Sequence, residues 1–252
     1  MPVEWTPILI VTVAAAVFLY GVSKTTMPVA GVLAGPVLAA VLTATTASAF
    51  AVPLLIVGDC FALALYRQHA DWGLIRRLIP GILVGFVITA VLFVFLDVRT
   101  IGRIIGALIL TSVILEVWRR RTTASVQSTE QAMSNRAAIG FFGTLAGMTS
   151  MAANAGGTAL TLYLVNMRVS MLAFMGTSTW FFFVMNVIKV PIVAALGLLS
   201  WQTLLADLMF LPAVVIGAVV GIVVFRGMNQ AAFINIALAL SAVAAIWLLV
   251  HG

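Results

Sequence analysis

Apolar residues run almost without interruption along this chain, and polar residues are confined to short stretches between them. A helix that crosses a bilayer needs about 20 mainly apolar residues. Turn residues and isolated charges divide the chain into roughly ten apolar segments, which predicts an all-α polytopic membrane protein with eight to ten transmembrane segments. The approximate segments are 6–22, 28–45, 47–66, 74–96, 100–118, 137–152, 155–167, 170–198, 202–225 and 229–250.

Three of these segments, 28–45, 137–152 and 155–167, are short for a complete crossing and rich in Gly, Pro, Ser and Thr. In transporters, short interrupted segments of this kind often stop near the midplane of the bilayer. We therefore expect some segments to be broken or re-entrant helices.

The composition excludes a water-soluble enzyme. Of the 252 residues, 63% are hydrophobic and 8% are charged, and the mean hydropathy is +1.22. Soluble domains have about 45–50% apolar and about 25% charged residues. The net charge of +6 is carried by too few residues to form a nucleic-acid-binding face, so the lipid bilayer is the expected partner. One cysteine and two distant histidines, His69 and His251, predict neither a metal site nor a cofactor.

Arginines in the short loops predict the orientation, because Lys and Arg accumulate on the cytoplasmic side. With five segments in each half, most loop arginines fall on one side of the membrane, and only Arg99 and Arg103 fall on the other side. The polar stretch 119–136 then reads as a cytoplasmic linker between the halves. The arginines of the cytoplasmic face are Arg67, Arg76, Arg77, Arg119, Arg120, Arg121, Arg136, Arg168 and Arg226.

The two halves of the chain resemble each other in order and spacing, which predicts an internal duplication. The predicted domains are a first membrane repeat at 1–120, a linker at 121–135 and a second membrane repeat at 136–252. The matched features, first half against second, are Gly21–Gly31 with Gly147–Gly157, Asp59 with Asn186, Asp71-Trp72 with Ser200-Trp201, Pro80–Gly85 with Pro212–Gly217, and Trp118 with Trp247.

Five segments per half would insert the second copy upside down relative to the first. Inverted-topology repeats place a binding site near the midplane at their interface, built from broken helices. This predicts a site at 21–31 and 147–157, around which the halves alternate access.

Lys24 and Asp59 interrupt long apolar runs. A lysine at membrane depth costs about 3 kcal/mol, so we read Lys24 as an anion ligand, flanked by Thr25 and with Pro28 opening the next helix. The alternative is a lysine that snorkels to the interface. Asp59 is read as a proton-coupling carboxylate or counter-charge, or else as part of a buried structural pair.

Further candidates lie in the second half. Asn186 and Lys189 are three residues apart and share a helical face, although Lys189 also fits interfacial snorkelling. Around 147–157, small residues and a helix N-terminus from about Thr158 predict an oxyanion site, or else tight helix packing. Trp180 and Phe181–Phe183 are assigned to lipid contact or packing, and Glu116 and Asp207 to arginine pairing or water. The second-half binding candidates are Thr149, Ser150, Asn154, Gly156, Gly157, Ser178, Asn186 and Lys189.

Four stretches resemble the sulfite exporter TauE/SafE family of bacterial anion transporters. They are GVSKTTMP at 21–28, VPLLIVGDCFALALYRQHADW at 52–72, MTSMAANAGGTALTLYL at 148–164 and MGTSTWFFFVMNVIKVP at 175–191. The resemblance implies a multi-pass protein of the bacterial inner membrane that exports or takes up sulfite, sulfonates or similar small anions.

The predicted function is that of a secondary transporter that exports a small sulfur-containing oxyanion. Protons are a candidate coupling ion. No nucleotide-binding GxxxxGK[ST] loop and no catalytic motif such as HExxH or GxSxG occurs, so neither ATP drive nor an enzyme is expected. The alternatives are a cation or metal transporter that uses Asp59 and Asn186, and a non-transporting scaffold subunit. Homo-oligomer formation is left open by the sequence.

Overall fold

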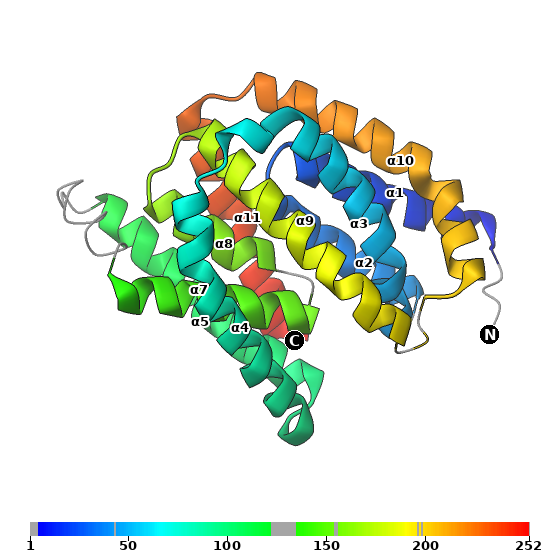
Figure 1. Cartoon of the computed structure of the whole chain (residues 1–252), viewed down its shortest axis with the longest axis horizontal. Helices are drawn as coiled ribbons and strands as arrows, with labels where there is room; N and C mark the ends of the chain where they lie inside the picture. The colour runs from blue at the N-terminus through cyan, green and yellow to red at the C-terminus, as the bar shows by residue number, and fades with distance from the viewer. Residues whose placement is uncertain are drawn as a thin grey trace. The chain divides into compact units, whose positions relative to one another are not determined.

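The computed structural model describes residues 5–42, 44–121, 135–153, 156–195, 197 and 199–251, and all regular structure in this part of the chain is helical. Figure 1 shows the course of the chain. The elements are α1 (Pro7–Thr25), η1 (Pro28–Leu33), α2 (Ala34–Val41), α3 (Ala44–Tyr66), η2 (Arg67–His69), α4 (Trp72–Phe95), α5 (Val98–Arg121), α7 (Arg136–Ala153), α8 (Gly156–Asn166), α9 (Met171–Ala195), α10 (Trp201–Arg226) and α11 (Gln230–His251).

Within the described residues, seven helices are long and apolar enough to cross a membrane, which confirms the predicted helical membrane class. These candidates are fewer than the predicted eight to ten segments. The three segments predicted to be short correspond to η1 with α2, to α7 and to α8. At 1.5 Å per residue, the 11-residue helix α8 extends about 16 Å, roughly half of the hydrocarbon core.

The chain divides into two compact units, and each of them draws on both halves of the sequence. Unit 1 comprises Met1–Gln68 and Thr179–Met228, and unit 2 comprises His69–Ser178 and Asn229–Gly252. Helix α9 begins in unit 2 and ends in unit 1. The predicted linker at 121–135 separates the N-terminal from the C-terminal half of the chain, whereas each compact unit combines parts of both halves. Most of that linker, 122–134, lies outside the described residues.

Unit 1 is organised around the contact of α1 with α10, which lie side by side in Figure 1. Glycines on both helices permit this approach. A Cβ atom built on Gly21 would overlap the carbonyl oxygen of Val214, and one built on Gly217 would overlap that of Phe18. Helix α3 packs against both of these helices.

Unit 2 contains two extensive helix pairs, α4 with α7 and α5 with α11. The first pair again meets at glycines, because a Cβ atom on Gly85 would overlap the carbonyl oxygen of Thr144, and one on Gly147 would overlap that of Ile82. Close packing of this kind is typical of small residues on membrane helices. Helix α8 packs against α7, α5 and α11.

Two matched helix starts are capped in the same way. The Asp71 side chain accepts a hydrogen bond from the Leu74 amide at 3.1 Å at the start of α4. The Ser200 hydroxyl accepts one from the Thr203 amide at 3.1 Å at the start of α10. Asp and Ser are both strong N-cap residues, so the matched Asp71-Trp72 and Ser200-Trp201 steps mark equivalent helix boundaries.

Candidate functional site

The end of α1 presents Lys24 to the interior of unit 1. Helix α1 stops after Thr25 because Met27 precedes a proline, which disfavours helical backbone, and Met27 is extended with φ −157° and ψ 124°. Pro28 then opens η1, as expected for a proline in a first helical turn. The predicted break in segment 21–31 therefore falls at Thr26 and Met27, and Lys24 belongs to the last turn of α1.

Three side chains hold this helix end in place. The Thr25 hydroxyl donates to the Ala218 carbonyl of α10 at 2.7 Å, and the Thr26 hydroxyl donates to the Gly221 carbonyl at 3.0 Å. The Tyr66 hydroxyl, from the end of α3, donates to the Thr25 carbonyl at 2.9 Å. The carbonyl groups at the end of a helix lack helical partners, so this last bond satisfies one of them. Thr25 thus positions the helix end with both its side chain and its backbone.

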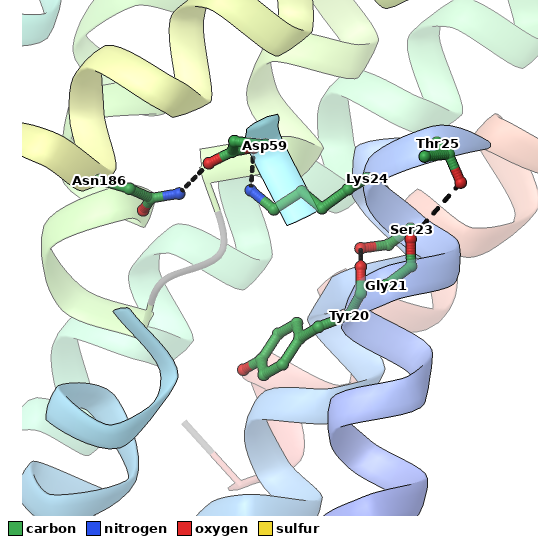
Figure 2. A network of polar contacts seen from close by, with 7 residues as sticks. All are labelled: Tyr20, Gly21, Ser23, Lys24, Thr25, Asp59 and Asn186. Atoms are coloured by element: carbon green, nitrogen blue, oxygen red, sulfur yellow. Dashed lines mark hydrogen bonds and ion pairs between the residues drawn. The ribbon is translucent and has the colours of Figure 1, made fainter. Parts of the chain in front are cut away.

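Lys24 forms a buried ion pair with Asp59 of α3, and Figure 2 shows the two side chains pointing at each other. The Lys24 Nζ atom lies 2.7 Å from Asp59 Oδ1, and the side chains are 8% and 1% exposed. The Asn186 Nδ2 atom of α9 donates to Asp59 Oδ2 at 2.7 Å. We call Lys24, Asp59 and Asn186 the polar triad. One carboxylate oxygen thus lies against the ammonium group and the other accepts a hydrogen bond, which offsets part of the cost of burying the charges.

Two further residues shape the triad, Phe182 and Gly58, and neither is among the predicted binding residues. The Lys24 Nζ atom lies 5.0 Å from the centre of the Phe182 ring, a cation–π distance. Phe182 had been assigned to packing or lipid contact, although its spacing of four residues from Asn186 on α9 indicates a shared face. A Cβ atom on Gly58 would lie 2.9 Å from Lys24 Cγ, so this glycine makes room for the lysine stem.

Lys189 adds a second positive charge near the triad. It lies three residues beyond Asn186 on α9, and its charge interacts with those of Asp59 and Lys24. Two lysines and one aspartate leave one formal positive charge at this place in unit 1. Because the Asp59 carboxylate is already paired with Lys24, and the local charge is positive, this arrangement suits an anionic ligand better than a metal ion.

The second predicted segment, 147–157, belongs to unit 2. Helix α7 ends at Ala153 and α8 begins at Gly156, while Asn154 lies outside the described residues. The Thr149 hydroxyl donates to the Leu145 and Ala146 carbonyls of its own helix, at 2.8 and 3.1 Å. Ser150 and Gly157 are buried. The Thr149 hydroxyl is thus bonded within its own helix, and a ligand-binding role of segment 147–157 stays a prediction.

Three other assignments can be compared with the structure. Ser178, in the unit 2 part of α9, is fully buried, and its hydroxyl has no hydrogen-bond partner among the described residues. The Trp180 indole N–H donates to the Arg67 carbonyl at 3.3 Å, so this side chain does more than pack against its neighbours. The expectation that Asp207 pairs with an arginine or faces water is wrong, since it is 4% exposed and its carboxylate oxygens have no hydrogen-bond partner within the described chain.

In a comparison with protein families, the chain matches the family model described as "Sulfite exporter TauE/SafE" over residues 13–248. No curated protein and no solved structure gives a significant match. The family match spans most of the chain and includes every residue of the polar triad, which confirms the resemblance drawn from the four sequence stretches.

Proposed function

Because the chain belongs to the sulfite exporter TauE/SafE family of membrane transporters, we propose that it exports a small sulfur-containing oxyanion, such as sulfite or an organosulfonate. The polar triad of unit 1 is the observation that carries this proposal. Buried ionisable residues in membrane helices commonly mark the path of a substrate or ion. We propose that the protein lies in the bacterial inner membrane and that the triad lies near the midplane of the bilayer, where the substrate binds.

The charges around the triad favour a small anion. Lys24 and Lys189 together outweigh Asp59 by one formal positive charge, in a region of low dielectric constant where such a charge acts strongly. An ammonium group forms charge-assisted hydrogen bonds with an oxyanion. Asn186 adds an uncharged amide that can donate to an oxygen. A sulfite or sulfonate group would therefore find both charge and donors here.

Asp59 gives the site a means of coupling. In the structure its carboxylate is the partner of Lys24, so an arriving anion competes with Asp59 for the ammonium group. Protonation of Asp59 would remove this competitor and raise the net positive charge by one. We propose that a proton on Asp59 favours anion binding and that its release favours anion dissociation. Proton movement and anion transport are then linked at one ion pair.

The match between the two sequence halves supports a duplicated origin of the site. Asp59 and Asn186 occupy matched positions, and they are bonded directly to each other. Equivalent residues of two repeats touch when they lie on the axis that relates those repeats. We propose inverted-topology repeats with Asp59 and Asn186 near that axis, and alternating access as the transport mechanism.

The central experiment measures sulfite flux in proteoliposomes made with purified full-length protein. The double variant Lys24→Met/Asp59→Asn removes both charges together, so that neither is left buried alone. We expect sulfite flux to fall about 10- to 100-fold, the range lost with a hydrogen bond to a charged group. The matched control Lys24→Arg keeps the positive charge and should retain more flux. Wild-type flux in the double variant, with normal elution in size-exclusion chromatography, would contradict the anion site.

The pH dependence of flux tests the coupling role separately. Asp59→Asn carries no titratable group, so its sulfite flux should depend less on pH than that of the wild type. An unchanged pH profile removes Asp59 from proton coupling but leaves the anion site standing. Inhibition by divalent metal ions in place of sulfonates would instead support cation transport. The predicted contribution of segment 147–157 is tested with Asn154→Leu, which should lower flux if that segment binds substrate.

A further inference from the structure

The face of the Phe182 ring is a second contact of the Lys24 ammonium group. The Lys24 Nζ atom lies over this ring at 5.0 Å from its centroid, and the same atom lies 2.7 Å from Asp59 Oδ1. The lysine side chain is 8% exposed, so water contributes little to the stabilisation of its charge. A positive charge over an aromatic face gains most when it is desolvated in this way. The ring is therefore placed to stabilise the ammonium group together with the carboxylate.

One face of α9 carries this ring together with two polar groups. Phe182, Asn186 and Lys189 follow one another at intervals of four and three residues, which places them on a common helical face. The Phe181 ring makes a T-shaped contact with the Phe182 ring, with 4.9 Å between the centroids and 88° between the planes. Phe181 is buried, so this contact restrains the orientation of the Phe182 ring.

The stem of Lys24 is held independently of its charge. A Cβ atom on Gly58 would lie 2.9 Å from Lys24 Cγ, so α3 closes on the lysine stem directly before Asp59. Lys24 also belongs to the last turn of α1, which the Thr25 hydroxyl attaches to α10. These contacts do not involve the Asp59 carboxylate. They therefore keep the ammonium group close to the ring when the carboxylate is neutral.

We propose that Phe182 is a positioning residue of the anion site, whose ring face holds the Lys24 ammonium group in place when Asp59 is neutral. The inference rests on the proposed function, in which Asp59 takes up a proton as the anion binds. The charges that act on Asp59 are those of Lys24 and Lys189, and the two lysines repel each other. Once Asp59 is neutral, its attraction for Lys24 is lost and this repulsion remains.

The ring supplies what a neutral Asp59 no longer provides. A buried amine without a counter-charge is costly to keep protonated, and an uncharged or displaced Lys24 is a poor ligand for an oxyanion. The ring does not titrate, so its attraction for the ammonium group persists when Asp59 gains a proton. Affinity for a ligand rises in proportion to the fraction of molecules that are ready to bind it. Phe182 thus acts on the anion through Lys24.

The test weakens the ring face in steps while the shape of the ring is kept. Phe182 of the full-length protein is replaced by mono-, di- and trifluorinated phenylalanine, because fluorine withdraws electrons from the ring face. In Asp59→Asn, the Kd for radiolabelled sulfite in nanodiscs should rise in steps, by about 2- to 30-fold in all, the range expected for a cation–π contact. The rise should be smaller with Asp59 intact, because the carboxylate also holds the ammonium group. The same analogues at Phe183, whose ring contacts Trp180, are the matched control and should leave the Kd unchanged.

Thermal unfolding without sulfite tests the ring independently of the transported substrate. Fluorination at Phe182 should lower the unfolding temperature of Asp59→Asn by about 2–4 °C and that of the wild type by less. It should have no effect in Lys24→Met/Asp59→Asn, which lacks both charges. The wild type and this double variant suffice for the test if Asp59→Asn does not fold.

The outcomes separate the role of Phe182 from the proposed function. An equal fall of the unfolding temperature in the wild type and in the double variant would overturn the role of Phe182. A sulfite Kd of Asp59→Asn that fluorination leaves unchanged would overturn it as well. If the unfolding temperatures change as expected and the wild type binds no sulfite, the hold of Phe182 on Lys24 is supported and the proposed sulfite transport fails.

Discussion

Two helix crossings, α1 with α10 in unit 1 and α7 with α4 in unit 2, are built in the same way from matched parts of the sequence. In unit 1, Gly21 and Gly217 each lie against the backbone of the opposite helix. In unit 2, Gly147 and Gly85 do the same. Gly21 matches Gly147 in the sequence, and Gly217 matches Gly85, so the likeness of the halves extends to the way in which their helices meet.

The two crossings differ beyond this shared contact. Both crossings have a further glycine in contact with the opposite helix, Gly221 of α10 in unit 1 and Gly143 of α7 in unit 2. In unit 1, Thr25 and Thr26 also donate hydrogen bonds to the opposite helix. The position that holds Lys24 in unit 1 corresponds to Ser150 in unit 2. A buried lysine must be held against its counter-charge, so the end of α1 needs a firm attachment.

The largest expected effect follows from breaking the ion pair of unit 1. Asp59→Ala leaves Lys24 buried without its partner and should lower the free energy of unfolding by about 3–5 kcal/mol. Thermal unfolding in detergent measures the loss, and hydrogen exchange should rise first in α1 and α3. The double variant Lys24→Met/Asp59→Leu should recover much of the stability. If it is less stable than Asp59→Ala, the pair is not the cause.

Alanine at the crossing glycines should destabilise both units. Gly21→Ala and Gly147→Ala each place a methyl group against the backbone of the partner helix, which should cost about 1–3 kcal/mol. The matched control is Gly140→Ala on α7, because no atom lies within 4 Å of a Cβ atom at that position. It should be neutral or stabilising. The equivalence of the crossings fails if one alanine is tolerated as well as the control.

The hydroxyl bonds should distinguish the crossings more finely. Thr25→Val removes the bond to Ala218 and should cost about 0.6 kcal/mol and at most about 1.7 kcal/mol, the average and the maximum found for bonds between membrane helices. Thr149→Val in unit 2 removes a bond within its own helix and should cost less. Thermal unfolding of the two variants under identical conditions gives the difference. A larger loss for Thr149→Val would reverse the comparison.

The two units should differ least at the matched caps of α4 and α10, because both helix starts are capped by a side chain in the same way. Asp71→Ala and Ser200→Ala should each lower the free energy of unfolding by about 0.5–2 kcal/mol, because an N-cap side chain is lost. Asparagine is an equally good cap, so Asp71→Asn and Ser200→Asn are the controls and should be nearly neutral. Chemical denaturation of the purified protein can resolve these values. Equal losses in the alanine and asparagine variants would show that capping is not the cause.

The sequence alone determined the helical membrane class and many local boundaries. Long apolar runs must become helices in lipid, because every backbone group there needs an internal partner. Pro28 stops α1 and opens η1 through local sterics, and Asp71 and Ser200 cap helices within one turn. The cost of burying a charge also makes Lys24 and Asp59 candidates from the sequence alone. These effects act over a few residues or depend on composition, so they can be read from the chain directly.

Only the tertiary structure decided which residues meet. It paired α1 with α10, brought Lys24, Asp59 and Asn186 together from three helices, and set Phe182 beneath the ammonium group. It also buried Asp207, where the sequence suggested water or an arginine. These contacts join different helices, and the 2.7 Å bond between Asn186 and Asp59 joins residues 127 positions apart. They depend on how whole helix faces pack, which periodicity along one helix cannot specify.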